Sequence, residues 1–290
     1  MDPIESRRGA WHQSTLESLL DGCSWQYYLT YVLGLPAPSG AASVAGTGYH
    51  KAIELYERGR MDGVVVTLDD MLVTAEAYVL ANISDMVAVA EARQAVTHWF
   101  DTGVKGGVSH RVWLADYIPV AIEPYFRMGL VDDTLPIAGW IDGVYKHTVS
   151  GEYIIVDHKT ANNLSRWGHD GALHRAQATM YSVALLLSPD YPEITTLLPM
   201  VYLVSRKTAG RGHSFEAIRR VTVQPDMNDV NLLGGRIVAA ESLVRDGAYT
   251  PKPWWPLCSE RWCPHYEGCQ VTGDLLGTPE EVRIRITAPQ

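Results

Sequence analysis

Two aspartates and one lysine near the middle of the chain are the residues best suited to chemistry. Asp142 ends the segment 139–142, and Asp157 and Lys159 lie two positions apart in the segment 153–159. Successive side chains of a β-strand point to opposite faces, so Asp157 and Lys159 would share one face. Pairing of the two segments would add Asp142 to that face. Two carboxylates suit Mg²⁺ or Mn²⁺, and a neighbouring lysine suits a metal-activated water that attacks a phosphodiester.

A simpler interpretation of the same residues stays open at this point. In a surface hairpin, Asp157 and Lys159 would form an ordinary ion pair with no catalytic role. The pattern Asp-x-Lys is short and occurs often by chance, so spacing alone does not separate the two interpretations.

The segments around these residues alternate between helical and strand patterns. Ser14 and Glu17 fit a capping box, which predicts an N-cap at Ser14 and a helix that ends near Leu33. The small residues at 37–45 predict a flexible connection. Further helices are expected at 48–58, 69–100, 172–187 and 227–245, and strands at 112–127, 135–145, 153–159, 197–205 and 215–223. The second and third strands should form one hairpin, and the last two strands another. This order predicts an α/β fold in which helices precede a central sheet.

The composition limits the class of protein. The chain has 290 residues, of which 47% are hydrophobic, and this permits a sizeable core and argues against disorder. The formal net charge of −9 argues against a strongly basic nucleic-acid-binding domain, although carboxylates that seat a metal ion also add negative charge. A polar N-terminus without a long apolar run predicts neither a secretory signal nor a membrane helix, and therefore a cytoplasmic protein.

The central residues resemble the signature of a known enzyme family. Asp142, followed 15 positions later by Asp157 and then by Lys159, resembles the motif of PD-(D/E)XK nucleases. The version is similar to that of RecB-like nucleases and CRISPR-associated exonucleases. Ile141 stands where the nominal pattern has proline, a departure that is common in the RecB-like branch.

Four further segments resemble motifs of the same family and follow one another in the family's order. The segment 46–50, which ends in His50, resembles the G-x-x-x-H motif, whose histidine is a metal ligand. The segment 177–181 resembles the Q-x-x-x-Y motif on the helix that follows the lysine strand. One cysteine ahead of aromatic residues near the N-terminus and three cysteines near the C-terminus complete the resemblance, at Cys23, Cys258, Cys263 and Cys269.

The resemblance implies a fold and an activity. The expected fold is a restriction-endonuclease-like α/β core with a mixed central β-sheet flanked by helices. We expect one nuclease domain over 1–290, a helical insertion at 51–110, and a cysteine-cluster region at residue 23 and 251–270. The expected activity is that of a metal-dependent DNA nuclease, mainly an exonuclease on single-stranded DNA ends in recombination, repair or spacer acquisition.

The resemblance also assigns roles to individual residues. Lys159 would assist the attacking water, while Gln177 and Tyr181 would orient the lysine or the substrate. Glu123 precedes the aspartate hairpin and could bind metal or activate water, but a surface glutamate is an equally open interpretation. The expected ligands of Mg²⁺ or Mn²⁺ are His50, Asp142, Asp157 and Glu123.

A basic segment offers contacts for a nucleic-acid backbone. Between positions 206 and 220 five basic residues stand against one acidic residue, in a chain whose net charge is −9. Phosphate contacts from such a segment would make binding depend on salt, although a solvated hairpin loop would have the same composition. The candidate contacts are Arg206, Lys207 and Arg211.

The four cysteines are too few for a disulfide scaffold in a chain of this length. From the residues alone they could hold an iron–sulfur cluster, hold a structural Zn²⁺ ion, or be unrelated free thiols. The resemblance favours a 4Fe-4S cluster that joins the N-terminal helix to the C-terminal tail.

Two other functions stay open beside the exonuclease. One is a sequence-specific endonuclease on the same fold, and the other is a non-catalytic subunit that binds nucleic acid or organises an assembly. The chain has no Walker A motif, so a helicase or recombination protein would be a separate partner. DNA is the expected partner, a membrane is not, and the sequence does not indicate an oligomeric state.

Overall fold

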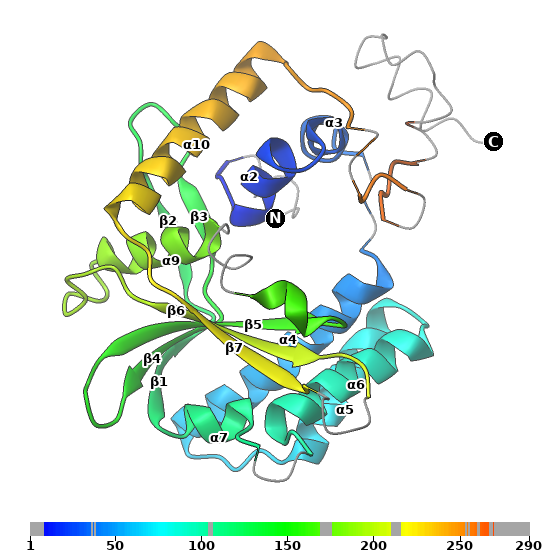
Figure 1. The fold of residues 1–290 in the computed structure, drawn as a ribbon, viewed down its shortest axis with the longest axis vertical. Helices are drawn as coiled ribbons and strands as arrows, with labels where there is room; N and C mark the ends of the chain where they lie inside the picture. Colours follow the sequence, from blue (N-terminus) through cyan, green and yellow to red (C-terminus); the bar gives the residue numbers. More distant parts are fainter. Residues whose placement is uncertain are drawn as a thin grey trace. The chain divides into compact units, whose positions relative to one another are not determined.

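The computed structural model, drawn in Figure 1, divides into two compact units. The sheet unit comprises residues 40–126 and 140–230, and the terminal unit comprises residues 1–39, 127–139 and 231–290. The structure describes residues 9–35, 37, 39–103, 107–168, 176–209, 216–252, 254, 256–259, 262–266 and 269.

The sheet unit is built on a five-stranded sheet in the order β1-β4-β5-β6-β7. Neighbouring strands are antiparallel except β5 and β6, which run parallel, so the sheet is mixed. Helix α9 (Ala176–Leu186) lies between β5 and β6 in the chain and supplies the crossover that a parallel pair requires. The five strands are β1 (Tyr117–Ile122), β4 (Gly143–His147), β5 (Tyr153–Ala161), β6 (Met200–Arg206) and β7 (Ile218–Val223).

The two predicted strand pairs are present. β4 and β5 form the first antiparallel hairpin, with Gly143 opposite Val156. β6 and β7 form the second pair. With helices on the sheet, this arrangement confirms the predicted α/β fold with a mixed central sheet.

Four helices pack on one face of the sheet (Figure 1). Their apolar side chains form the main core together with strand residues such as Val156 and Leu203. The close contact between the first two of these helices depends on Gly48, because a Cβ atom there would lie 2.9 Å from the carbonyl oxygen of Ala75. The helices are α4 (Ala41–Asp62), α5 (Leu68–Asn82), α6 (Met86–Phe100) and α7 (His110–Leu114).

Four predicted boundaries in the sheet unit are wrong. The helix predicted at 69–100 is two helices, α5 and α6, because the chain leaves the helix at 83–85 and Asp85 caps the second one. Helix α4 begins at Ala41, so most of the segment predicted as flexible is helical, as its alanines favour. The strand predicted at 112–127 separates into the end of α7, β1, and β2 (Tyr125–Met128). The break falls at Glu123, whose φ of 54° is incompatible with a strand.

The strand predicted at 135–145 is also interrupted. It separates into β3 (Ile137–Trp140), which pairs with β2, and β4 of the main sheet. Ile141 and Asp142 lie between the two strands, and the main-chain N–H of Ile141 donates to the carbonyl oxygen of Pro124. Asp142 therefore lies in a bend directly before β4 and not within a strand.

The first helix of the terminal unit, α2 (Gln13–Leu20), starts earlier than predicted. Its N-cap is His12, whose main-chain N–H donates to the hydroxyl of Thr15 at 3.0 Å, so the prediction of an N-cap at Ser14 is wrong. Trp11 forms a β-bridge to strand β3. The chain is therefore extended up to His12 and turns into the helix there.

The same helix also ends earlier than predicted. After Leu20 the chain turns at Gly22 and continues as α3 (Ser24–Tyr27) and a π-helical turn at Tyr28–Val32. A Cβ atom at Gly22 would lie only 2.9 Å from the carbonyl oxygen of Ser18, so the turn requires glycine at this position.

Helix α10 (Met227–Asp246) is the last long helix of the described chain. Within the terminal unit its Glu241 carboxylate accepts hydrogen bonds from the indole of Trp11 and from the main chain of Leu135. None of the described helices is long and apolar enough to cross a lipid bilayer.

Candidate active site

The central strand β5 presents its two charged residues on one face, as alternation predicts. Asp157 is fully buried, and the Lys159 ammonium nitrogen lies 2.6 Å from its Oδ2 atom. The parallel register with β6 places Tyr202 and Val204 beside them. The ion pair therefore joins a buried carboxylate to a lysine whose side chain stays 24% exposed to solvent.

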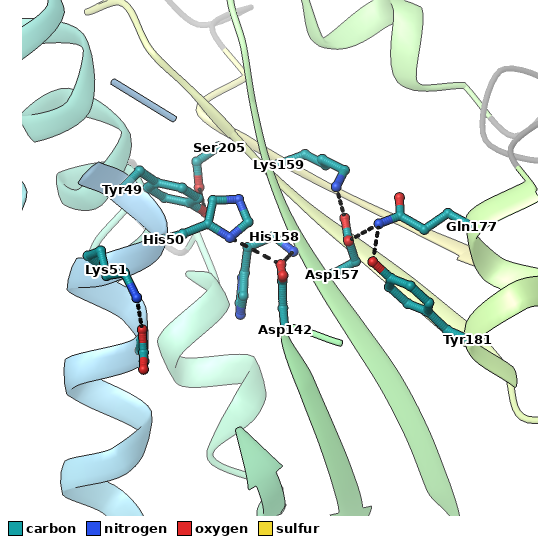
Figure 2. A network of polar contacts seen from close by, with 11 residues as sticks. Tyr49, His50, Lys51, Asp142, Asp157, His158, Lys159, Gln177, Tyr181 and Ser205 are labelled. Carbon is teal, nitrogen blue, oxygen red and sulfur yellow. Dashed lines mark hydrogen bonds and ion pairs between the residues drawn. The ribbon is translucent and has the colours of Figure 1, made fainter. Parts of the chain in front are cut away.

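Helix α9 adds two side chains to this face. Gln177 and Tyr181 are four positions apart and share a side of the helix, as predicted. The Nε2 atom of Gln177 donates to Oδ1 of Asp157 at 2.7 Å and to the hydroxyl of Tyr181 at 3.0 Å (Figure 2). We call this connected group the lysine network. Its members are Asp157, Lys159, Gln177 and Tyr181.

Asp142 approaches the same region from the bend before β4. Its Oδ2 atom accepts a hydrogen bond from the main-chain N–H of His158 at 2.6 Å. The same oxygen lies 3.3 Å from Nδ1 of His50 (Figure 2). The next residue is Gly143. A larger residue would not fit there, because a Cβ atom would lie 2.4 Å from the ring of Tyr145.

His50 comes to the site from helix α4. The neighbouring hydroxyl of Tyr49 lies 3.1 Å from the hydroxyl of Ser205 on β6, and both side chains are fully buried. This contact fixes the helix against the sheet. The side chains of His50 and Asp142 stay 28% and 14% exposed, so a ligand reaches them from solvent although protein surrounds them.

Glu123 completes the set through an unusual backbone conformation. Its φ of 54° lies in the left-handed region, which glutamate rarely adopts. Its main-chain N–H donates to the carbonyl oxygen of Asp142 at 3.2 Å. Such strain is typical of functional sites, where surrounding contacts hold the backbone in place.

Three of the predicted ligands form one compact group, which we call the ligand cluster: His50, Glu123 and Asp142. One ligand atom of each residue lies within 4.8 Å of the others. One imidazole and two carboxylates are a donor set that suits Mn²⁺ or Mg²⁺. The residues present therefore fit the divalent cation that the sequence predicts.

The electrostatics of the ligand cluster also favour a cation. Burial and the nearby charge of Asp142 raise the pKa of Glu123 to about 7. Burial alone would raise the pKa of Asp142, but the adjacent His50 outweighs it and holds that pKa below its ordinary value. Burial would lower the pKa of His50, and Asp142 outweighs that effect and raises it. The cluster therefore holds two carboxylates that repel each other and share one imidazole.

Asp157 is not a member of this group among the described residues. Its two oxygens contact Lys159 and Gln177. Burial raises the pKa of Asp157, against the opposing effect of the Lys159 ammonium group. The four predicted ligands thus divide into the three of the ligand cluster and one that anchors the lysine.

His158 received no role from the sequence, yet it touches the ligand cluster twice. Besides its main-chain bond to Asp142, its ring packs edge-on against the ring of His50, with centroids 6.4 Å apart. Strand alternation could have predicted this position of His158, because it directs the side chain to the face opposite Lys159. On that face the ring contacts His50 of helix α4 and Trp99 of helix α6.

The predicted phosphate contacts are engaged within the protein. The Nε atom of Arg206 donates to the carbonyl oxygen of Glu216 at 2.8 Å. The ammonium group of Lys207 lies 3.4 Å from the Glu91 carboxylate, and its side chain is only 10% exposed. Arg211 lies outside the described residues, so a role for this segment in binding DNA stays a prediction.

The four cysteines belong to the terminal unit, and all are free and partly exposed. Burial, followed by the charges of the other three cysteines, raises the pKa of Cys269 to about 11. Burial also raises the pKa of Cys263, and the charges of Cys23 and Cys258 add to it. The thiols are therefore close enough to influence one another's pKa, and a cluster held by them stays a prediction.

Comparisons with known proteins bear on the identity of the chain. No curated protein matches it significantly. A solved structure described as "Crystal structure of SSO0001" is 13% identical, with a TM-score of 0.32, over 80% of this chain and 85% of that chain. The model of the PD-(D/E)XK nuclease superfamily, hydrolases of nucleic acid that typically use divalent metals, matches residues 10–270. Because this match covers most of the sequence, the chain belongs to the PD-(D/E)XK nuclease superfamily.

Proposed function

We propose that this protein is a divalent-metal-dependent DNA nuclease of the RecB-like branch. It acts as an exonuclease on free DNA ends, preferably single-stranded, in recombination, repair or spacer acquisition. The observation that carries the proposal is the ligand cluster next to the ion pair of buried Asp157 and partly exposed Lys159. Superfamily membership supports hydrolysis of nucleic acid, and the RecB-like motifs support the exonuclease assignment.

His50, Glu123 and Asp142 would hold Mg²⁺ or Mn²⁺, and Asp157 is the fourth candidate ligand. When bound, the ion supplies positive charge to the phosphate and lowers the pKa of a water molecule. The protein's own residues prepare the site for it. The main-chain N–H of His158 fixes Oδ2 of Asp142, and His50 would bind the ion through an imidazole nitrogen that carries no proton.

Lys159 is the residue that we assign to the attacking water. Asp157 holds the ammonium group at 2.6 Å, and Gln177 in turn fixes the other oxygen of Asp157. Held in this way, Lys159 positions the attacking water, or its positive charge stabilises the negative charge that develops on the phosphate in the transition state. Tyr181, whose hydroxyl accepts from Gln177, orients the substrate.

The test compares three DNA substrates and two lysine variants. Labelled linear single-stranded, linear duplex and circular DNA are incubated with Mn²⁺ and wild-type protein, Lys159→Ala or Lys146→Ala. Lys146 is the matched control, because it lies on the adjacent strand β4 with its ammonium group over the ring of Tyr153. We expect cleavage of linear DNA only, retained in Lys146→Ala and lost in Lys159→Ala.

The other outcomes distinguish the alternative functions. Cleavage of circular DNA would identify an endonuclease on the same fold. Equal activity in wild type and Lys159→Ala, or no cleavage with metal supplied, would contradict the catalytic assignment and favour a non-catalytic subunit that binds nucleic acid.

We also propose that Cys23, Cys258, Cys263 and Cys269 hold a 4Fe-4S cluster, with Zn²⁺ as the alternative. The proximity of the thiols and the RecB-like motif order support this assignment. A bound cluster would join the start of the terminal unit to its end and close a long loop of the chain. A bound metal would stabilise the thiolate form of Cys269 and would thereby counteract the effect that raises the pKa of this thiol.

Anaerobic purification tests the cysteine proposal. We expect a brown protein with iron and acid-labile sulfide, and Cys258→Ser should lose both. A colourless protein with one zinc ion per chain would replace the iron–sulfur assignment with the zinc alternative. A metal-free protein would contradict both.

A further inference from the structure

Two exposed aromatic residues lie next to the two carboxylates of the ligand cluster in the chain. Tyr125 begins β2, two positions after Glu123, and Trp140 ends β3, two positions before Asp142. Their rings lie against each other, with centroids 4.7 Å apart and planes inclined by 51°. Because two residues of extended chain span at most about 7 Å, both aromatic residues lie close to the proposed metal ligands. We call Tyr125 and Trp140 the aromatic pair.

The exposure of the aromatic pair is unusual within the sheet unit. Tyr125 is 51% exposed, and Trp140 is 52% exposed. Among the described residues of that unit, no other aromatic side chain is more than half exposed. Large aromatic side chains are mostly buried in folded proteins, and adjacent apolar groups that stay at the surface often mark a binding site. The aromatic pair is therefore a candidate for a binding role.

The packing of strands β2 and β3 does not depend on the aromatic pair. Successive side chains of a strand point to opposite faces. Phe126, the neighbour of Tyr125, packs edge-on against Tyr181 of helix α9, with ring centroids 5.7 Å apart. Ile141, the neighbour of Trp140, is buried. The residues that anchor the two strands thus alternate with the aromatic pair, whose rings stay half exposed to solvent.

Main-chain hydrogen bonds fix the aromatic pair relative to the ligand cluster. The N–H of Glu123 donates to the carbonyl oxygen of Asp142 at 3.2 Å. The N–H of Ile141 donates to the carbonyl oxygen of Pro124 at 3.1 Å. These bonds join the two short segments that connect each carboxylate ligand to its aromatic neighbour. A substrate group that contacts the rings would therefore be held at a set distance from the metal ligands.

An aromatic surface beside a site that cleaves phosphodiesters suits one chemical class of ligand, the unpaired nucleobase. Every nucleobase has a flat π face, and unpaired bases stack on aromatic side chains with little regard to sequence. The bases of a duplex are already stacked on one another, so only an unpaired nucleotide offers this face. An apolar segment of a protein is the alternative occupant. The nucleobase is favoured because the chain belongs to a superfamily of nucleic-acid hydrolases and the aromatic pair adjoins the proposed metal ligands.

We propose that the aromatic pair is a stacking site for an unpaired nucleobase beside the scissile phosphate, and that it gives the enzyme its preference for single-stranded DNA ends. The inference rests on the proposed function, because it takes the ligand cluster as the place where the phosphodiester is cleaved. Trp140 has the larger ring system and supplies most of the stacking surface. Tyr125 packs against Trp140 and orients its ring.

Binding of a labelled single-stranded oligonucleotide, measured by fluorescence anisotropy in EDTA, tests the site without metal-dependent cleavage. Loss of one stacking side chain typically weakens binding by about 5- to 100-fold. We expect the Kd to rise by this factor in Trp140→Ala, to rise less in Tyr125→Ala, and to stay near wild type in Trp140→Phe, which keeps an aromatic ring. The thermal unfolding midpoint of each variant shows whether it is folded.

Two controls separate stacking from other effects. Tyr153→Ala removes an aromatic ring at the start of strand β5, about 13 Å along the strand from Asp157, and should leave the Kd unchanged. The second control is a sugar-phosphate strand of the same length without bases. Wild type and Trp140→Ala should bind this strand weakly and equally, because it offers no base to stack.

An unchanged Kd in folded Trp140→Ala would overturn the stacking site, and so would an equal loss of affinity for the strand without bases. Wild-type protein that does not bind single-stranded DNA would also overturn it. Self-association that is lost in Trp140→Ala, with DNA binding retained, would identify the aromatic pair as a protein interface instead. If wild type binds DNA through Trp140 but cleaves none with Mn²⁺ supplied, the proposed function fails and the stacking site stands.

Discussion

The ligand cluster and the lysine network are neighbours, and they differ in whether a positively charged side chain balances their carboxylates. In the lysine network, the Lys159 ammonium nitrogen lies 2.6 Å from the Asp157 carboxylate, and Gln177 donates to the other oxygen. In the ligand cluster, the carboxylates of Glu123 and Asp142 share one imidazole. The first region neutralises its charge internally, and the second does not.

This difference teaches that the acidic residues of the site are not equivalent. Burial and Asp142 raise the pKa of Glu123 to about 7, which indicates that the ligand cluster lacks positive charge. A divalent cation would supply it. Asp157 already holds a cation, the ammonium group of Lys159, and a metal that binds there must share the carboxylate with it.

The largest effects should come from breaking each region separately. Asp142→Asn and Lys159→Met should each lower the cleavage rate by about 100- to 10,000-fold, because one removes a metal ligand and the other the water-positioning group. Their metal affinities should differ. At a Mn²⁺ concentration of 100 times the wild-type Kd, metal should stabilise wild type and Lys159→Met by about 2.7 kcal/mol and Asp142→Asn by far less.

Thermal unfolding with and without Mn²⁺ measures this separation. The exposed Asp190 provides the control Asp190→Asn, which should keep both activity and metal-dependent stabilisation. Equal loss of Mn²⁺ stabilisation in Asp142→Asn and Lys159→Met would mean that the two regions form one metal site. That result would contradict the separate roles assigned to the ligand cluster and the lysine network.

Glu123 permits a second test, because the ligand cluster stores strain that the lysine network does not. Glu123→Gly removes a ligand and also suits the left-handed backbone, whose cost for other residues is of order 1–3 kcal/mol. In the absence of metal we expect the free energy of unfolding to rise by about 1 kcal/mol, while the Kd for Mn²⁺ rises roughly 10-fold or more.

Denaturant unfolding and Mn²⁺ calorimetry on the same samples measure the two changes. Asp133 also has a positive φ, of 58°, outside both regions. Asp133→Gly should therefore stabilise the protein without any change in metal affinity. A Glu123→Gly protein that is less stable than wild type would show that contacts of the side chain outweigh the strain.

The sequence was sufficient for the parts of the site that depend on local periodicity. Strand alternation places Asp157 and Lys159 on one face, and helical spacing places Gln177 and Tyr181 on one side of α9. These relations follow from the repeats of β-strand and α-helix, which distant contacts do not alter. The strand hairpins were predictable for the same reason, whereas the mixed sheet was expected from the family resemblance.

The ligand cluster was less predictable because its geometry is not periodic. Asp142 lies in a bend between strands, and Glu123 reaches it through a left-handed residue that only tertiary contacts hold in place. The N-cap at His12 also depends on a distant contact, the bridge from Trp11 to strand β3. Local propensity favoured Ser14, and the long-range pairing decided otherwise.

A smaller effect is expected within the lysine network. Gln177→Ala leaves Oδ1 of the buried Asp157 without its donor, and an unpaired buried polar atom costs about 1–3 kcal/mol. We expect the cleavage rate to fall about 10-fold and the Kd for Mn²⁺ to stay within about twofold of wild type. Gln224→Ala is the matched control, since the amide of exposed Gln224 donates to the main-chain carbonyl oxygens of Leu197 and Pro225. A large loss of metal affinity in Gln177→Ala would place Asp157 among the metal ligands.

The smallest effect should come from Tyr181→Phe. The ring would keep its edge-on packing against Phe126, with centroids 5.7 Å apart, and only the hydroxyl that accepts from Gln177 would be lost. A single hydrogen bond contributes about 1 kcal/mol, which corresponds to roughly a fivefold change in rate. If Tyr181 orients DNA as proposed, the loss should fall mainly on KM for the DNA substrate. If its hydroxyl acts only by holding Gln177, the loss should fall on kcat and should disappear in the Gln177→Ala background, because the bond that it supports is already absent there.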